Sequence, residues 1–156
     1  GIETQSLNGV LAGYPVADIV VTLIDGSYHD VDSSDIAFQL AAKIALRDGL
    51  VKGGSVFTEP IMALEISCPE EFMGSVIGDL NTRRAKITEL GSIGISKTAR
   101  ADVPLAEMFN YANALRSLTQ GRASFSMEPS YYAQVPNNLA EKIVGARQEY
   151  LNRKKA

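Results

Sequence analysis

The alternation of apolar and polar residues in the second half of the chain predicts a β-sheet. Apolar side chains occupy most alternate positions in Met62–Cys68, Ile95–Val103 and Ala123–Met127, so each segment would present one apolar and one polar face. A short fourth strand is predicted at Ile87–Leu90, and Gly91–Gly94 would form the turn that follows it. The four segments are expected to share one sheet with one buried face.

Apolar residues at helical spacing predict two helices between these strands. The first begins at Pro69, and the second begins at Pro104 and closes near Gly121. The order of elements is then β-α-β-β-α-β, the ferredoxin-like plan of the α+β class, in which two helices cover one face of a four-stranded antiparallel sheet. A further helix that begins at Pro136-Asn137 would follow the last strand.

The first part of the chain predicts a partial α/β domain of β-loop-α type. The end of a helix at Gly1–Asn8 precedes a strand at Val16–Ile24, a segment rich in β-branched residues that alternate between two faces. A polar loop then leads to a helix that Asp32 or Ser33 would cap and Gly49 would end.

A candidate linker, Lys52-Gly53-Gly54-Ser55, separates these two patterns. We therefore predict two domains, residues 1–54 and residues 55–156. The chain has 156 residues, 46% of them apolar, and a chain of about 150 residues buries roughly 68–70% of its unfolded surface. The first residue is Gly1 rather than Met, so we expect the sequence to be a piece of a longer one.

Composition excludes several classes of protein. No apolar run approaches the roughly 20 residues of a membrane span, so no membrane contact is expected. The single cysteine, Cys68, excludes an internal disulfide framework, and together with a single histidine it argues against a tetrahedral zinc site. The net charge of −3 provides no general attraction for nucleic acid, so any RNA contact must be local.

The sequence contains no catalytic constellation. It has neither a G-x-x-x-x-G-K-[ST] phosphate loop nor a G-x-S-x-G nucleophile elbow, so nucleotide hydrolysis by this chain alone is not expected. Asp30, Asp32 and Asp35 are spaced somewhat like calcium ligands. However, the loop lacks the glycine and the terminal glutamate of a calcium loop, and helix capping explains two of the aspartates. We predict no catalytic residue, no metal and no cofactor for this chain.

One polar loop has two interpretations. Its residues are Gly26, Ser27, Tyr28, His29 and Asp30, between the predicted strand and helix. They form either a solvated turn or a tip that contacts RNA, in which a stacking ring, an imidazole and hydroxyls would touch bases or ribose. The acidic residues of the loop argue against contacts with phosphates.

The helix that begins at Pro69 also carries two features with alternative explanations. Arg83, Arg84 and Lys86 at its end either complement the helix dipole or contact phosphates. Gly74 and Gly78 each cost about 1 kcal/mol relative to alanine inside a helix, so some close neighbour should require them. That neighbour is either the domain's own sheet or an external partner.

The sequence resembles the C-terminal part of bacterial elongation factor G in six strings that follow one another through nearly the whole chain. The strings are GVLAGYPV at 9–16, DGSYHDVDSS at 25–34, EPIM at 59–62, GSVIGDLN at 74–81, VPLAEMF at 103–109 and LRSLTQGRAS at 115–124. An ordered series of this kind is far more specific than any one motif.

The resemblance implies that residues 1–54 form the second half of the factor's fourth domain, and that residues 55–156 form its fifth domain with an added terminal helix. The whole factor is a GTPase that drives tRNA and mRNA translocation on the ribosome, and its GTP and Mg²⁺ are held in an N-terminal domain outside this chain. Its fourth domain reaches the decoding region, where Gly26–Asp30 matches a tip loop that touches the tRNA–mRNA duplex. The fifth domain lies against rRNA near the stalk base of the large subunit, and the three basic residues at the helix end are the candidate contacts.

The resemblance leaves several alternatives open. A paralogous factor for ribosome recycling carries the same motifs, and a ferredoxin-like module that binds a small regulatory molecule is a more distant alternative. The bacterial cytoplasm and the matrix of an organelle are equally compatible locations, and we expect a monomer. Since only half of the fourth domain is present, residues 1–54 should have unpaired strand edges and an exposed core. We expect this part to be less ordered than the rest or shielded by a neighbouring molecule.

Overall fold

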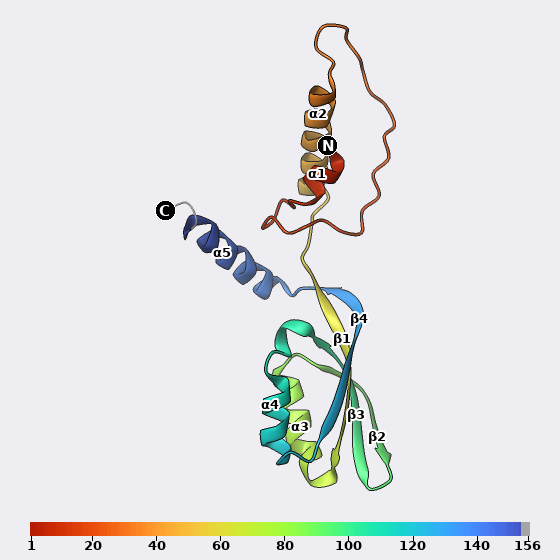
Figure 1. The fold of residues 1–156 in the computed structure, drawn as a ribbon, viewed down its shortest axis with the longest axis vertical. Helices are drawn as coiled ribbons and strands as arrows, with labels where there is room; N and C mark the ends of the chain where they lie inside the picture. The colour runs from red at the N-terminus through yellow and green to blue at the C-terminus, as the bar shows by residue number, and fades with distance from the viewer. Residues whose placement is uncertain (154–156) are drawn as a thin grey trace. The chain divides into compact units, whose positions relative to one another are not determined.

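The computed structural model describes residues 1–153, which form two compact units. Unit 2 is the continuous segment Thr58–Gln134, and unit 1 combines Gly1–Phe57 with the C-terminal segment that begins at Val135 (Figure 1). The predicted domains, residues 1–54 and 55–156, divide the chain at nearly the same place but group the terminal helix with the second part. That domain assignment stays a prediction.

Unit 2 has the predicted ferredoxin-like order of elements. Its four strands form one antiparallel sheet in the spatial order β2-β3-β1-β4. Helices α3 and α4 lie together on one face of this sheet (Figure 1). The elements are β1 (Thr58–Pro69), α3 (Glu70–Thr82), β2 (Lys86–Ile93), β3 (Ser96–Pro104), the 3₁₀ turn η1 (Leu105–Glu107), α4 (Tyr111–Thr119) and β4 (Ser124–Gln134). The α+β fold class is therefore confirmed.

The core of unit 2 follows from the period-two pattern of its two central strands. Leu64 and Ile66 of β1 are paired in register with Ala101 and Ala99 of β3, and all four side chains are buried. They pack against the apolar stripe of α3, of which Val76 and Leu80 are buried. Because alternate residues of a strand point to opposite faces, the same strands leave polar residues on the other face of the sheet.

The second predicted helix of unit 2 is wrong in its extent. It does not run from Pro104 to Gly121 but is divided into η1 and α4. Asn110 lies between them with φ +62°, a left-handed conformation that an α-helix cannot contain and that asparagine tolerates better than most residues. The turn after β2 is also shorter than predicted, because β2 continues to Ile93.

The described part of unit 1 contains three helices, α1 (Ile2–Ser6), α2 (Asp35–Lys52) and α5 (Asn137–Arg153). The N-cap of α2 is Ser34, whose Oγ accepts a hydrogen bond from the Ala37 N–H at 3.2 Å, rather than the predicted Asp32 or Ser33. The helix also continues past Gly49 and ends before Gly53. A glycine weakens a helix interior by about 1 kcal/mol, but neighbouring residues can carry the helix through it. No helix within residues 1–153 is both long enough and apolar enough to cross a membrane.

The predicted strand at Val16–Ile24 is not present. Residues 19–29 have neither helix nor strand geometry, and no strand among residues 1–153 pairs with them. Val20, Leu23 and Ile24 are 94%, 90% and 91% exposed. The alternating pattern is real, but a strand needs a neighbour to satisfy its N–H and C=O groups, and the described chain provides none. The exposed apolar side chains agree with the open core expected of a half-domain.

Candidate nucleic-acid interface

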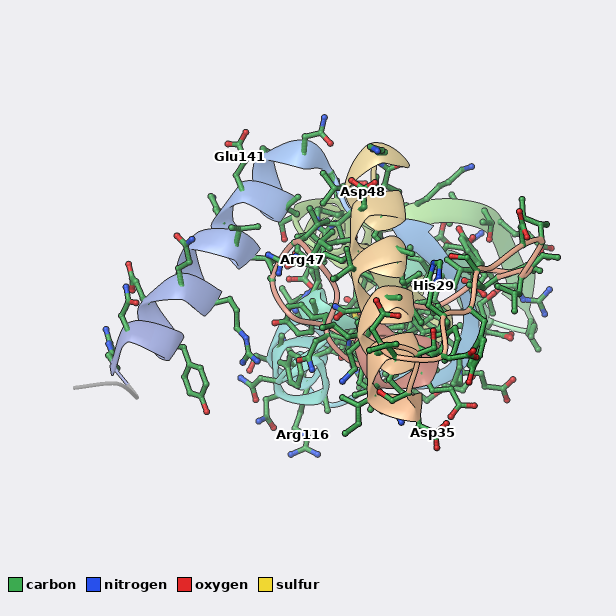
Figure 2. The ribbon with its side chains drawn as sticks, turned by 90° about the horizontal axis from the view of Figure 1, so that it is seen from above. His29, Asp35, Arg47, Asp48, Arg116 and Glu141 are labelled. Atoms are coloured by element: carbon green, nitrogen blue, oxygen red, sulfur yellow. The ribbon has the colours of Figure 1, made fainter. Side chains whose placement is uncertain are left out.

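The loop Gly26–Asp30 lies between residues 19–25, which have neither helix nor strand geometry, and α2, and all five of its residues are exposed. Two hydrogen bonds between His29 and Ser33 close the turn that follows this loop and leads to α2. The His29 N–H donates to Ser33 Oγ at 2.8 Å, and the Ser33 N–H donates to the His29 carbonyl at 3.1 Å. Within residues 1–153 the side chains of Tyr28 and His29 have no hydrogen-bond, ionic or ring partner, so both are available to a ligand. His29 is labelled in Figure 2.

The charges around this loop limit what it can bind. Residues 14–42 contain five aspartates and no lysine or arginine. Phosphate groups are bound mainly by lysine, arginine and free backbone N–H groups, so the loop is poorly suited to hold a nucleic-acid backbone. A tyrosine ring, an imidazole and a hydroxyl are instead suited to stacking on bases and to hydrogen bonds with base edges or 2′-hydroxyls. No group of three potential metal ligands occurs among residues 1–153.

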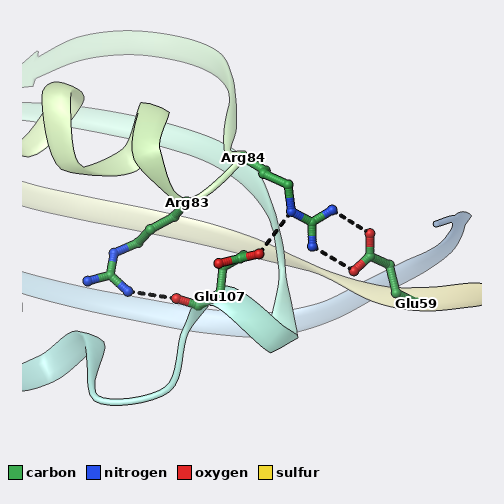
Figure 3. A network of polar contacts seen from close by, with 4 residues as sticks. All are labelled: Glu59, Arg83, Arg84 and Glu107. Atoms are coloured by element: carbon green, nitrogen blue, oxygen red, sulfur yellow. Dashed lines mark hydrogen bonds and ion pairs between the residues drawn. The ribbon is translucent and has the colours of Figure 1, made fainter. Parts of the chain in front are cut away.

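Arg84 is held by two glutamates inside unit 2 (Figure 3). Its Nη1 and Nη2 donate to the two carboxylate oxygens of Glu59 at 2.7 and 2.9 Å, and its Nε donates to Glu107 Oε1 at 2.9 Å. These hydrogen bonds, above all those to Glu59, raise the pKa of the Arg84 guanidinium. The bidentate contact with Glu59 and the single bond to Glu107 join the start of β1 to η1 through Arg84, two residues after α3.

Arg83 is also engaged by hydrogen bonds within unit 2. Its Nε donates to Asp79 Oδ2 at 2.8 Å and its Nη1 to the Glu107 carbonyl at 2.6 Å, while the guanidinium lies 5.0 Å from the centre of the Tyr111 ring. Lys86, by contrast, is exposed and has no ion-pair partner among residues 1–153. Of the three basic residues predicted as rRNA contacts, Arg83 and Arg84 are thus engaged within unit 2, while Lys86 has no ion-pair partner among residues 1–153; contact of all three with rRNA stays a prediction.

The sequence contains no local signal for the partners of Arg84. Glu59 and Glu107 lie 25 and 23 residues away from it along the chain, and only the folded topology brings them together. A cluster of basic residues at a helix end looks the same in sequence whether it is free or paired. Neither glutamate could therefore be identified as a partner of Arg84 from the sequence.

The two glycines of α3 do not pack on the sheet. A Cβ atom built on Gly74 or Gly78 would meet no other heavy atom within 4 Å. The explanation that the domain's own sheet requires these glycines is therefore wrong for the described residues. The alternative, the close approach of an external partner, stays a prediction.

Comparisons with known proteins match both parts of the chain. The family model described as "Elongation factor G, domain IV" matches residues 1–54, and the one described as "Elongation factor G C-terminus" matches residues 56–143. An elongation factor G from Aquifex pyrophilus is 54% identical over 147 residues, which are 94% of this chain and 21% of that protein. A crystal structure from Thermus thermophilus matches with a TM-score of 0.85 and 41% identity, over 95% of this chain and 22% of the other. The chain thus spans about a fifth of the length of these relatives.

Proposed function

The chain belongs to the elongation factor G family, and on that premise we propose that it forms the ribosome-binding C-terminal part of a factor that promotes GTP-dependent translocation of tRNA and mRNA. GTP and Mg²⁺ would bind outside these residues, because the sequence lacks a phosphate-binding loop. The contribution of this chain would be made by position rather than by bond chemistry. Its site of action would be the cytoplasm or the matrix of an organelle.

The observation that supports this proposal is the exposed loop Gly26–Asp30. The His29 backbone is tied to Ser33 at the turn that leads to α2, while the side chains of Tyr28 and His29 have no hydrogen-bond, ionic or ring partner within residues 1–153, so the loop exposes both without using them internally. We propose that these side chains contact the bases or riboses of the tRNA–mRNA duplex in the decoding region. Since the loop is acidic, it would leave the phosphates to other groups.

Unit 2 would bind rRNA near the stalk base of the large subunit. Of the basic residues at the end of α3, Lys86 would contact phosphate directly. Arg83 and Arg84 would support the same surface from within, because both are engaged with acidic residues and backbone of unit 2. In the proposed interface Lys86 would contact the rRNA, and Arg83 and Arg84 would stabilise the surface around it.

The proposal can be tested in an elongation factor G that carries this sequence as its C-terminal part. His29→Ala should slow single-turnover translocation by about tenfold, a barrier change of roughly 1.4 kcal/mol, because the imidazole would be lost from the duplex contact. GTP hydrolysis should stay within about twofold of the wild type, since the loop takes no part in the chemistry. The matched control is Gln39→Ala, which truncates an exposed side chain on α2 outside the loop.

Unchanged translocation in the His29→Ala factor would remove the proposed role of the loop. An equal loss in the Gln39→Ala control would show that truncation anywhere on this part of the protein disturbs it, and would also argue against a specific contact at His29.

A further inference from the structure

Helix α5 has one covered side, and an arginine lies at the end of it. Leu139, Ile143 and Arg147 follow one another at intervals of four residues and are each half-buried, whereas Gly145, Ala146 and the residues at 148–150 are exposed. Positions four apart lie on the same side of a helix. Two turns of this side are apolar, and the third is occupied by the long polar side chain of Arg147.

Arg147 contacts a loop near the start of the chain. Its Nε donates to the Ala12 carbonyl at 3.3 Å, and its guanidinium lies 5.7 Å from the centre of the Tyr14 ring and 5.3 Å from that of Tyr150. A guanidinium within about 6 Å of an aromatic ring is attracted to it, and its planar shape allows it to lie against a ring while it also donates a hydrogen bond. Arg147 thus combines contacts that a purely apolar residue could not make.

The loop that receives Arg147 is defined by its own hydrogen bonds. The Gly9 N–H donates to the Tyr14 carbonyl at 2.8 Å, and the Gly13 N–H donates to the Gly9 carbonyl at 3.1 Å. The Val16 N–H donates to the Ser6 carbonyl at 2.6 Å and so ties the end of the loop to α1. A Cβ on Gly9 would lie 2.5 Å from the Tyr14 carbonyl oxygen, so the turn requires glycine at that position.

Tyr14 links this loop to the ends of unit 1 as well. Its ring meets the Phe57 ring edge-on, with centroids 5.9 Å apart and planes at 87°. The Phe57 carbonyl accepts a hydrogen bond from the Val135 N–H at 2.9 Å, so the residues at which the chain leaves and re-enters unit 1 are joined. Arg147 and Phe57 therefore both contact Tyr14, which precedes the unpaired segment 19–29 that leads to Gly26–Asp30.

We propose that Arg147 is a positioning residue, which fastens α5 to the Gly9–Val16 loop and thereby fixes the starting point of the segment that carries the tip loop. The segment from 19 to 29 has no strand partner among residues 1–153, and no backbone hydrogen bond ties the chain between Val16 and His29 to another described segment, so the Gly9–Val16 loop is the nearest fixed part of the chain before it. The proposal rests on the proposed function of the tip loop for its effect on translocation, but the fastening itself is a separate property of the free protein.

The same helix offers a matched control. Arg153 lies six residues beyond Arg147, its side chain is 83% exposed, and it forms an ion pair with Glu149 at 4.0 Å. An exposed pair of this kind contributes little. Arg147→Met and Arg153→Met each remove one guanidinium group from α5. In both, Met keeps much of the length and apolar surface of the arginine side chain.

The first experiment measures hydrogen exchange in a free elongation factor G that carries this sequence. In Arg147→Met, the amides of Gly9, Gly13 and Val16 should exchange about three- to tenfold faster, as expected from the loss of one partly exposed cation–π contact and one hydrogen bond. Arg153→Met should leave these rates unchanged. Tyr14→Leu should reproduce the effect of Arg147→Met, and Tyr14→Phe should not, because it keeps the ring.

The second experiment measures translocation and GTP hydrolysis with the same factors. Arg147→Met should slow translocation about three- to tenfold and leave GTP hydrolysis unchanged, while Arg147→Lys, which keeps the cation and a donor, should recover part of the loss. Combining Arg147→Met with Tyr14→Leu should slow translocation by less than the product of the two single effects.

Two results would overturn the proposal. Unchanged exchange at Gly9, Gly13 and Val16 in Arg147→Met would show that Arg147 does not fasten the loop. Faster exchange without slower translocation, in a factor whose His29→Ala variant is impaired, would show that the fastening does not position the tip loop. If His29→Ala has no effect but the exchange rates respond as expected, the proposed function fails while the contact of Arg147 with the loop stands.

Discussion

The two units differ in how far their apolar residues find a second layer to pack against. In unit 2, the apolar faces of β1 and β3 are covered by α3 and α4, and the side chains between them are buried. In unit 1, Leu46 and Val135 are the only apolar residues within the described chain that are buried to the same degree. Apolar periodicity is present in both parts of the sequence. It specifies which side of an element should be covered, but it does not supply the element that covers it.

The largest expected effect comes from truncation of the core of unit 2. Leu80 is 0% exposed at the sheet-facing side of α3, and Leu80→Ala should lower the free energy of unfolding by about 2–5 kcal/mol, from lost transfer energy and the cavity left behind. Ile36→Ala on α2 should change it by less than about 0.5 kcal/mol, because this side chain is 78% exposed. Urea unfolding of both variants measures the difference, and similar losses at the two positions would erase the contrast between the units.

A smaller effect is expected from the ion-pair network of unit 2. Arg84→Met leaves Glu59, whose side chain is only 13% exposed, without its bidentate partner, and should cost about 1–3 kcal/mol. The matched control is Arg116→Met on α4, since Arg116 is exposed and has no side-chain partner within residues 1–153. Equal stability of the two variants would place the Arg84 network among surface ion pairs that contribute nothing measurable.

The fold of unit 2 could be predicted because each element with an apolar face finds the element that covers it within the same chain. Every strand that alternates has a neighbour there, and Leu64 and Ile66 face helices whose stripes were visible in the sequence. The division of the second helix was missed because it depends on the left-handed conformation of one residue, Asn110, which asparagine tolerates but does not require. In unit 1 the prediction of a strand at Val16–Ile24 failed because alternation does not create a pairing partner.

The candidate site could be predicted in part. The polar composition of Gly26–Asp30 indicated an exposed loop, and the structure confirms its exposure, whereas its contact with nucleic acid stays a prediction. The basic residues at the end of α3 illustrate the opposite case. Their charge was visible in the sequence, but the engagement of Arg84 with Glu59 depends on the folding of β1 against the end of α3. A cluster of basic residues in the sequence therefore does not show whether the side chains are free to bind a partner or form ion pairs within the protein.

A third prediction tests whether the two units respond independently. Ser34→Ala removes the hydroxyl that accepts from the Ala37 N–H, and should weaken the first turn of α2 by about 0.5–2 kcal/mol. Hydrogen exchange at the Ala37 amide should be faster, while exchange in β1 and β3 should not change. Ser27→Ala, in the exposed loop, serves as the control and should alter neither. A parallel change in the sheet of unit 2 would show that the units are energetically coupled.

The smallest change in stability at neutral pH is expected at Tyr111, whose hydroxyl lies unpaired in the core of unit 2 among the described residues. Tyr111 is buried, and its hydroxyl is the buried side-chain polar atom without a hydrogen-bond partner among the described residues. Its ring packs edge-on against Phe125 at 5.2 Å and lies under the Arg83 guanidinium, and both contacts would survive in Tyr111→Phe. Removal of an unpartnered hydroxyl should therefore change the free energy of unfolding by less than about 1 kcal/mol.

The same substitution should have a larger effect at alkaline pH. Burial raises the pKa of the Tyr111 hydroxyl above its ordinary value of 10.0, so above that pH the unfolded chain releases this proton while the folded protein keeps it. Stability is then fully present below pH 10.0 and is lost as the pH rises toward the folded-state pKa, with a limiting slope of about 1.4 kcal/mol per pH unit for one group. Tyr111→Phe lacks this loss, so its stability relative to the wild type should increase as the pH rises above that value. Urea unfolding across this pH range measures the difference in stability. The control is Tyr132→Phe, at an exposed position, whose stability should change with pH as that of the wild type does. Parallel pH profiles for Tyr111→Phe and the wild type would contradict the prediction, because they would show that the Tyr111 hydroxyl ionises as readily in the folded protein as in the unfolded chain.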